Sequence, residues 1–83
     1  MTDNRLKVFC TVADTLSFSK AAALLGISQP AVSKNIAVLE AEIGGALFIR
    51  INKTLILTDK GKQLLTIASS ILEEYSKIDS IKE

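Results

Sequence analysis

The sequence predicts a small, mainly α-helical domain with a three-helix core, a short two-stranded hairpin and a long final helix. Three observations predict this fold. Apolar residues recur at spacings of three and four along most of the chain, β-branched residues gather between residues 47 and 58, and glycines or hydroxyl residues separate the segments. A chain of 83 residues has room for one domain with a single core.

The composition excludes several kinds of site. The chain has no histidine and only one cysteine, so it lacks the commonest general base, an internal disulfide and a cysteine-cluster metal site. We therefore expect no enzyme activity, no catalytic residues, no cofactor and no metal. Cys10 lies in an apolar stretch and is interpreted as a buried, unreactive thiol. The sequence shows no secretory signal and no apolar run near the roughly 18 residues of a membrane span, so we expect a cytoplasmic protein without a membrane partner.

Two short helices are predicted to open the chain. The first covers residues 6–16, and its apolar residues share one face: Leu6, Phe9, Val12, Ala13 and Leu16. The second follows an N-cap at Ser17 and ends at Gly26. Its apolar residues repeat the spacing: Phe18, Ala21, Ala22 and Leu25. Ile27, in the turn that follows, is expected to fill the core.

A third helix is predicted directly after this turn. Ser28 is its expected N-cap, Pro30 is tolerated in the first turn, and Gly44-Gly45 ends it. Its core stripe consists of Val32, Ile36, Leu39 and Ile43. A short helix, a turn with glycine and a longer helix form the helix-turn-helix arrangement.

The opposite face of this third helix is small, polar or basic. It consists of Pro30, Ser33, Lys34, Ala37 and Ala41. Such a face can approach a DNA groove closely, and recognition helices contact bases with their N-terminal half. Glu40 and Glu42 lie only at the far end, so negative charge is kept away from that half.

Residues 47–58 are predicted to form two short strands, a wing, joined by a turn at Asn52-Lys53 without the glycine that tight turns prefer. Thr58 is the expected N-cap of the last helix, with Asp59 in its first turn. Apolar residues of this helix alternate spacings of four and three, which is typical of a coiled-coil seam. We expect these residues and their neighbour Leu72 to mediate dimerisation: Leu64, Ala68, Ile71, Leu72, Tyr75 and Ile78. The alternative is that the seam packs within the chain, onto the first helix.

The charge is unevenly distributed along the chain. Residues 1–63 carry eight basic and five acidic side chains, a net charge of +3, and residues 64–83 carry two basic and four acidic ones, a net charge of −2. The basic part therefore coincides with the helix-turn-helix and the wing, which favours a nucleic-acid partner.

A set of motifs spans nearly the whole chain. They are Ser17-Phe18-Ser19-Lys20-Ala21-Ala22 with Leu25, Ser28-Gln29-Pro30-Ala31-Val32-Ser33-Lys34, Leu39-Glu40, Gly44, Leu47-Phe48, Arg50, and Leu57-Thr58 with Gly61. Together they resemble the N-terminal DNA-binding domain of LysR-type bacterial transcriptional regulators. The molybdate-responsive regulators have a related winged module, but Gln29-Pro30-Ala31 fits them less well.

The resemblance implies a winged helix-turn-helix over residues 1–58 and a linker or dimerisation helix over residues 59–83, with the family's C-terminal ligand-binding domain absent from this chain. It implies a homodimer that reads an inverted-repeat operator in double-stranded DNA. A tetramer and a small-molecule inducer would belong to the intact regulator. The DNA-contacting residues that it implies are Ser19, Ser28, Gln29, Pro30, Ser33, Lys34, Arg50 and Lys53.

Two features depart from the family pattern. Position 34 is more often arginine, and the wing turn holds one basic residue, Lys53. A competing hypothesis is a protein-interaction module that uses the wing and the seam and binds no DNA. Replacing Gln29 and Lys34 by alanine would separate the two hypotheses, since only a DNA-binding protein would lose duplex retention.

Overall fold

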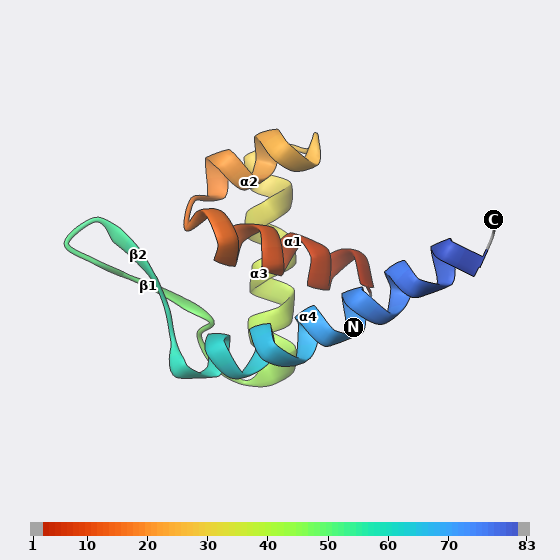
Figure 1. Cartoon of the computed structure of the whole chain (residues 1–83). Helices are drawn as coiled ribbons and strands as arrows, with labels where there is room; N and C mark the ends of the chain where they lie inside the picture. Colours follow the sequence, from red (N-terminus) through yellow and green to blue (C-terminus); the bar gives the residue numbers. More distant parts are fainter. Residues whose placement is uncertain (1–2, 82–83) are drawn as a thin grey trace.

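A computed structural model describes residues 3–81 of the chain. It contains, in order, α1 (Asp3–Thr15), α2 (Phe18–Leu25), α3 (Gln29–Ile43), β1 (Phe48–Ile51), β2 (Thr54–Leu57) and α4 (Asp59–Ile81). The hairpin strands are antiparallel, and the two ends of the sheet pair Phe48 with Leu57 and Ile51 with Thr54. The hairpin projects from one side of the helices, and the second half of α4 extends from the other (Figure 1). The predicted three-helix core, wing and long final helix are confirmed.

The helices begin and end at the predicted capping residues. The Ser17 hydroxyl accepts a hydrogen bond from the Lys20 N–H at 3.1 Å, and the Ser28 hydroxyl accepts one from the Ala31 N–H at 3.2 Å. Gly26 ends α2 and Gly44 ends α3, both in the left-handed conformation that glycine adopts without strain. These caps give α2 and α3 their lengths and hence define the helix-turn-helix.

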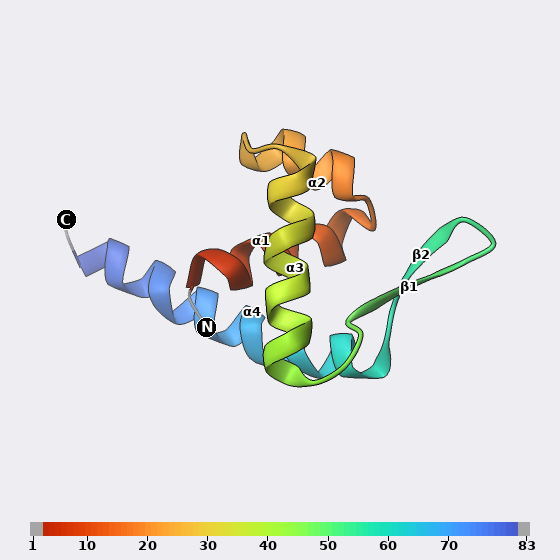
Figure 2. The ribbon, with the colours of Figure 1, turned by 180° about the vertical axis from the view of Figure 1, so that it is seen from behind.

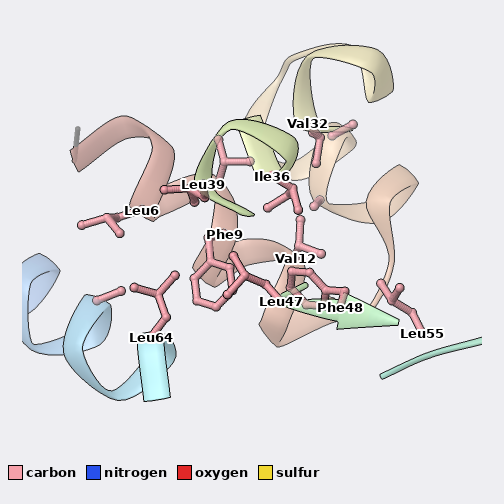
Figure 3. Close-up of a cluster of buried hydrophobic side chains, with 14 residues drawn as sticks. Leu6, Phe9, Val12, Val32, Ile36, Leu39, Leu47, Phe48, Leu55 and Leu64 are labelled. Atoms are coloured by element: carbon pink, nitrogen blue, oxygen red, sulfur yellow. The ribbon is translucent and has the colours of Figure 1, made fainter. Parts of the chain in front are cut away.

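The core lies where α1 packs against α2, α3 and α4 (Figure 3). Phe9, Val12, Val32 and Leu39 are fully buried, as their positions on the apolar faces predict. The ring of Phe9 lies 5.5 Å from that of Phe48, which attaches the base of the wing to the helices. One face of α3 therefore packs against the core, and its opposite face lies at the surface.

Two predicted core residues lie at the surface instead. Leu16 is 47% exposed because α1 ends at Thr15 and Leu16 adopts a left-handed conformation, with φ of 49°. Ile27 is 38% exposed. Its N–H bonds to the Ala22 carbonyl across the turn, so the backbone of the turn is satisfied while the side chain points outward. The predictions for these two side chains are wrong.

The face of α4 divides into two parts. Ala68 is fully buried and Leu64 is 9% exposed, and both belong to the core. The prediction of one continuous intermolecular seam is therefore wrong for these two residues, because α1 already covers them, as in the alternative of packing within the chain. Leu72 is half-buried against the same core.

None of the helices in residues 3–81 has the length and apolar character that crossing a membrane requires.

Candidate nucleic-acid interface

The outward face of α3 is a smooth strip of exposed side chains. Its members are exposed, as the helical spacing predicts: Pro30, Ser33, Lys34, Ala37 and Ala41. Gln29, the first residue of the helix, is exposed as well. In the view from behind, α3 lies in front of α1, and no other helix or strand covers it (Figure 2). Because most of these side chains are short, the helix backbone can come close to a partner surface, while Gln29 and Lys34 supply hydrogen-bond donors.

A groove of about 230 Å³ runs between α3 and the wing. Ser33, Ala37 and Glu40 line it from α3, and Ile49 and Arg50 line it from β1. The hydroxyl of Ser33 and the guanidinium of Arg50 suit phosphate oxygens, while most of the other lining residues are apolar.

The wing ends in a tight turn without glycine. Asn52 and Lys53 both have positive φ, 51° and 68°, the conformation of a type I′ turn, which matches the twist of the two strands. This geometry places the single basic residue of the turn, Lys53, at the tip of the hairpin, where its side chain is exposed.

The sequence-predicted contact residues all lie at the surface: Ser19, Ser28, Gln29, Pro30, Ser33, Lys34, Arg50 and Lys53. Ser33 and Arg50 share the groove. Lys53 lies apart from them at the end of the wing. Ser19 lies in the first turn of α2, where its hydroxyl is 3.2 Å from that of Ser17. Ser28 uses its hydroxyl oxygen to cap α3.

No described residue forms an ion pair with the basic side chains of α3 and the wing. The ion pairs seen elsewhere include Arg5 with Glu42 at 3.5 Å and Lys77 with Glu74 at 2.9 Å. Neither involves Lys34, Arg50 or Lys53. Their charges therefore remain available to an anionic partner.

The structure offers no sign of a catalytic or metal centre in the part that it describes. No group of three or more potential metal ligands occurs in residues 3–81. Cys10 is half-buried, and burial, followed by the charge of Asp14, raises the pKa of its thiol, although a hydrogen bond with Ser69 acts in the other direction. A raised pKa keeps the thiol protonated, in agreement with an unreactive cysteine.

Of the nine residues that line the groove, the predicted contact residues include only Ser33 and Arg50. The sequence predicts Ile49 only as part of a strand, Ala37 only as part of the small outward face of the helix, and Glu40 only as a residue at its far end. The motif Leu39-Glu40 was a signal for Glu40, but its hydrogen bond partner, the N–H of Leu47, is seven residues away and becomes visible only in three dimensions.

A second exposed surface lies on α4. It is an apolar stripe beside the core-facing side of the helix, and its members are Ile67, Ile71, Tyr75, Ile78 and Ile81. Ile71, Tyr75 and Ile78 were predicted to mediate dimerisation. Ile67 was missed, because the predicted seam is rotated toward the core.

A family model described as bacterial regulatory helix-turn-helix protein, lysR family, matches residues 4–62. The chain is 49% identical over 73 residues to the HTH-type transcriptional regulator BbuR of Bordetella bronchiseptica, covering 88% of this chain and 22% of that protein. It is 43% identical over 82 residues to the uncharacterized HTH-type transcriptional regulator YvbU of Bacillus subtilis, covering 98% of this chain and 28% of that protein. The chain thus spans less than a third of the length of either relative.

Solved structures resemble the whole described fold. A BenM_DBD/catB site 1 DNA complex matches with a TM-score of 0.91 and 32% identity, covering 99% of this chain and 92% of that one. A CbnR_DBD-DNA complex matches with a TM-score of 0.89 and 32% identity, covering 99% and 94%. A LysR-family transcriptional regulator from Eggerthella lenta matches with a TM-score of 0.80 and 46% identity, covering 83% and 99%.

Proposed function

This chain belongs to the LysR family of bacterial regulatory helix-turn-helix proteins, and from that premise we propose that it is the sequence-specific DNA-binding part of a transcription regulator. The observation that carries the proposal is the exposed N-terminal half of α3 beside a wing whose cations, Arg50 and Lys53, form no ion pair with any described residue. The structures that match its fold include DNA complexes.

The chemistry of α3 supports insertion into the major groove. The Gln29 amide can donate to and accept from adenine, and Lys34 can donate to guanine or to a phosphate. Ser19, Ser28, Ser33 and Arg50 suit phosphate oxygens, the exposed ring of Pro30 can make apolar contact in the groove, and Lys53 on the wing suits the adjacent minor groove or its phosphates. Phosphate contacts set the orientation of the protein on the duplex, and base contacts set the sequence preference.

We further propose that two chains form a homodimer through the exposed stripe of α4. The core covers Leu64 and Ala68 but leaves Ile71, Tyr75 and Ile78 at the surface. Exposed apolar side chains at helical spacing favour pairing with a second helix. A twofold dimer would present two α3 helices to an inverted repeat, so residues 1–58 would read DNA and residues 59–83 would set the distance between the half-sites.

Selection of bound duplexes from a random pool tests the proposal. We expect the wild-type chain to enrich an inverted repeat. The double variant Gln29→Ala/Lys34→Ala should lose retention of the enriched duplex while its dimerisation stays unchanged. The matched control is Lys77→Ala, which removes a cation from α4 outside the proposed interface and should bind as the wild type does.

Two results would contradict the proposal. Enrichment of no sequence by the wild-type chain would favour the protein-interaction module. Equal retention by the double variant and the wild type would place the DNA contact elsewhere on the surface.

A further inference from the structure

One residue, Leu47, connects three elements of the fold through its backbone. Its N–H donates to Oε2 of Glu40 in α3 at 2.8 Å, and its carbonyl accepts from the N–H of Thr58, the N-cap of α4, at 2.9 Å. Leu47 is fully buried directly before β1 (Figure 3). The end of α3, the base of the wing and the start of α4 therefore share one anchor.

Two further hydrogen bonds of Thr58 stabilise the same junction. The Thr58 hydroxyl donates to the Ala46 carbonyl at 2.7 Å and accepts from the Gly61 N–H at 3.0 Å. Among the described residues, Glu40 contributes the only side-chain hydrogen bond that joins the body of α3 to this point. A hydrogen bond from a backbone N–H to a carboxylate is stronger than one between two neutral groups. A buried N–H that loses its hydrogen-bond partner lowers the stability of the fold.

Glu40 places a negative charge in the groove between α3 and the wing. It lines the same groove as Arg50 and Ser33, the two side chains proposed to bind phosphate. A carboxylate that served no other purpose there would repel the phosphates and lower DNA affinity. Its hydrogen bond to Leu47 gives the carboxylate a purpose that does not require contact with DNA.

We propose that Glu40 is a positioning residue for DNA recognition: by holding the N–H of Leu47, it sets the wing relative to α3. This inference rests on the proposed function, since it concerns how two DNA-contacting elements keep their relative position. Glu40 acts through the wing, and the wing contacts the DNA.

Two substitutions at this position separate the reach of the side chain from its charge. Glu40→Gln keeps an acceptor at the same distance without the charge, and Glu40→Asp keeps the charge on a side chain one methylene shorter. On the enriched duplex we expect Glu40→Gln to bind within about threefold of the wild type, and Glu40→Asp to bind about tenfold more weakly. Glu42→Asp, on the same helix but paired with Arg5 of α1, is the matched control and should bind as the wild type does.

A double-mutant cycle with Lys53→Ala tests whether the effect passes through the wing. Lys53→Ala should weaken binding clearly in the wild-type and Glu42→Asp backgrounds. It should have little further effect in the Glu40→Asp background, because the tip of the wing is then already displaced. Circular dichroism at the assay temperature establishes that each variant is folded.

Each other outcome overturns the inference. Wild-type affinity of Glu40→Asp, equal weakness of Glu40→Gln and Glu40→Asp, or an unchanged effect of Lys53→Ala would exclude positioning through this bond. Failure of Glu40→Asp to fold would make the bond a determinant of folding instead. If the wild-type chain retained no duplex, the proposed function would fail as well, and that result is distinct from the other four.

Discussion

Gly61, in the first turn of α4, shows how one residue limits the packing where the wing meets α4. A Cβ atom at this position would lie 2.4 Å from the Leu47 carbonyl oxygen and 2.5 Å from a methyl carbon of Leu57. Real Cβ atoms do not approach backbone atoms so closely, so a larger residue must displace the start of α4. The glycine of the Leu57-Thr58 motif is thus explained by close approach rather than by a turn.

We predict that Gly61→Ala lowers the free energy of unfolding by about 1–3 kcal/mol, because overpacking outweighs the roughly 1 kcal/mol by which alanine favours a helix. Chemical denaturation measures this change. The control is Gly45→Ala, because a Cβ at position 45 would meet only the flexible side chain of Lys60. This variant should change the free energy of unfolding by less than about 0.5 kcal/mol. A stabilised Gly61→Ala variant would contradict the packing described here.

Among the elements, the wing has a turn that suits its two strands but requires an unfavourable backbone conformation at Lys53. The left-handed conformation of Lys53 is unfavourable for a residue with a Cβ, whereas asparagine, as at position 52, tolerates it better. The basic residue at the tip therefore stands where glycine would be more stable. This trade of stability for charge is typical of a binding site.

Lys53→Gly is predicted to raise the free energy of unfolding by about 0.5–1 kcal/mol by relieving this strain. Lys53→Ala removes the same charge but keeps the strain, so it should give no such gain. Both variants should lose DNA affinity equally. Equal stabilisation by alanine and glycine in denaturation curves would exclude strain as the cause.

The last helix is an element with two apolar sides, one facing the core and one exposed. Ile78 is 54% exposed, so charge at this position is compatible with the folded chain. We predict that Ile78→Lys weakens the dimer at least about tenfold, because burying the exposed half of this isoleucine contributes on the order of 1 kcal/mol in each of two chains.

Sedimentation velocity over a range of protein concentrations measures this weakening. Ser80→Lys is the control, since at about 100° per residue it lies roughly 200° around the helix from Ile78 and its side chain is also exposed. Monomers formed by both variants, or by neither, would contradict dimerisation through this stripe.

At the scale of the whole molecule, a near-neutral chain separates into parts of opposite charge. The net charge of +1 is the sum of +3 in residues 1–63 and −2 in residues 64–83. The described residues extend 47 Å along their longest axis because α4 continues past the core, away from the wing. The acidic half of α4 is therefore held away from the surface proposed to meet the DNA.

A dimer with this geometry should require a fixed spacing of half-sites. Insertion of about five base pairs between the half-sites turns them to opposite sides of the duplex and should abolish binding to both, whereas about ten base pairs restore the same side. Electrophoretic mobility shifts measure the effect, and the same insertion outside the repeat is the control. Equal affinity for every spacing would show that each chain binds alone.

The elements, their caps and the exposed face of α3 follow from the sequence, because they depend on local spacing and on residues such as Ser17, Ser28 and Gly44. Which apolar side chains become core depends on tertiary packing. The spacing of α4 placed Leu64 and Ile78 on one stripe, but α1 covers only the first. Likewise, Glu40 looked like a surface acid until folding brought Leu47 within hydrogen-bond distance. Both differences have the same physical reason: burial and long-range hydrogen bonds depend on which elements pack together, and periodicity within one helix carries no information about its neighbours.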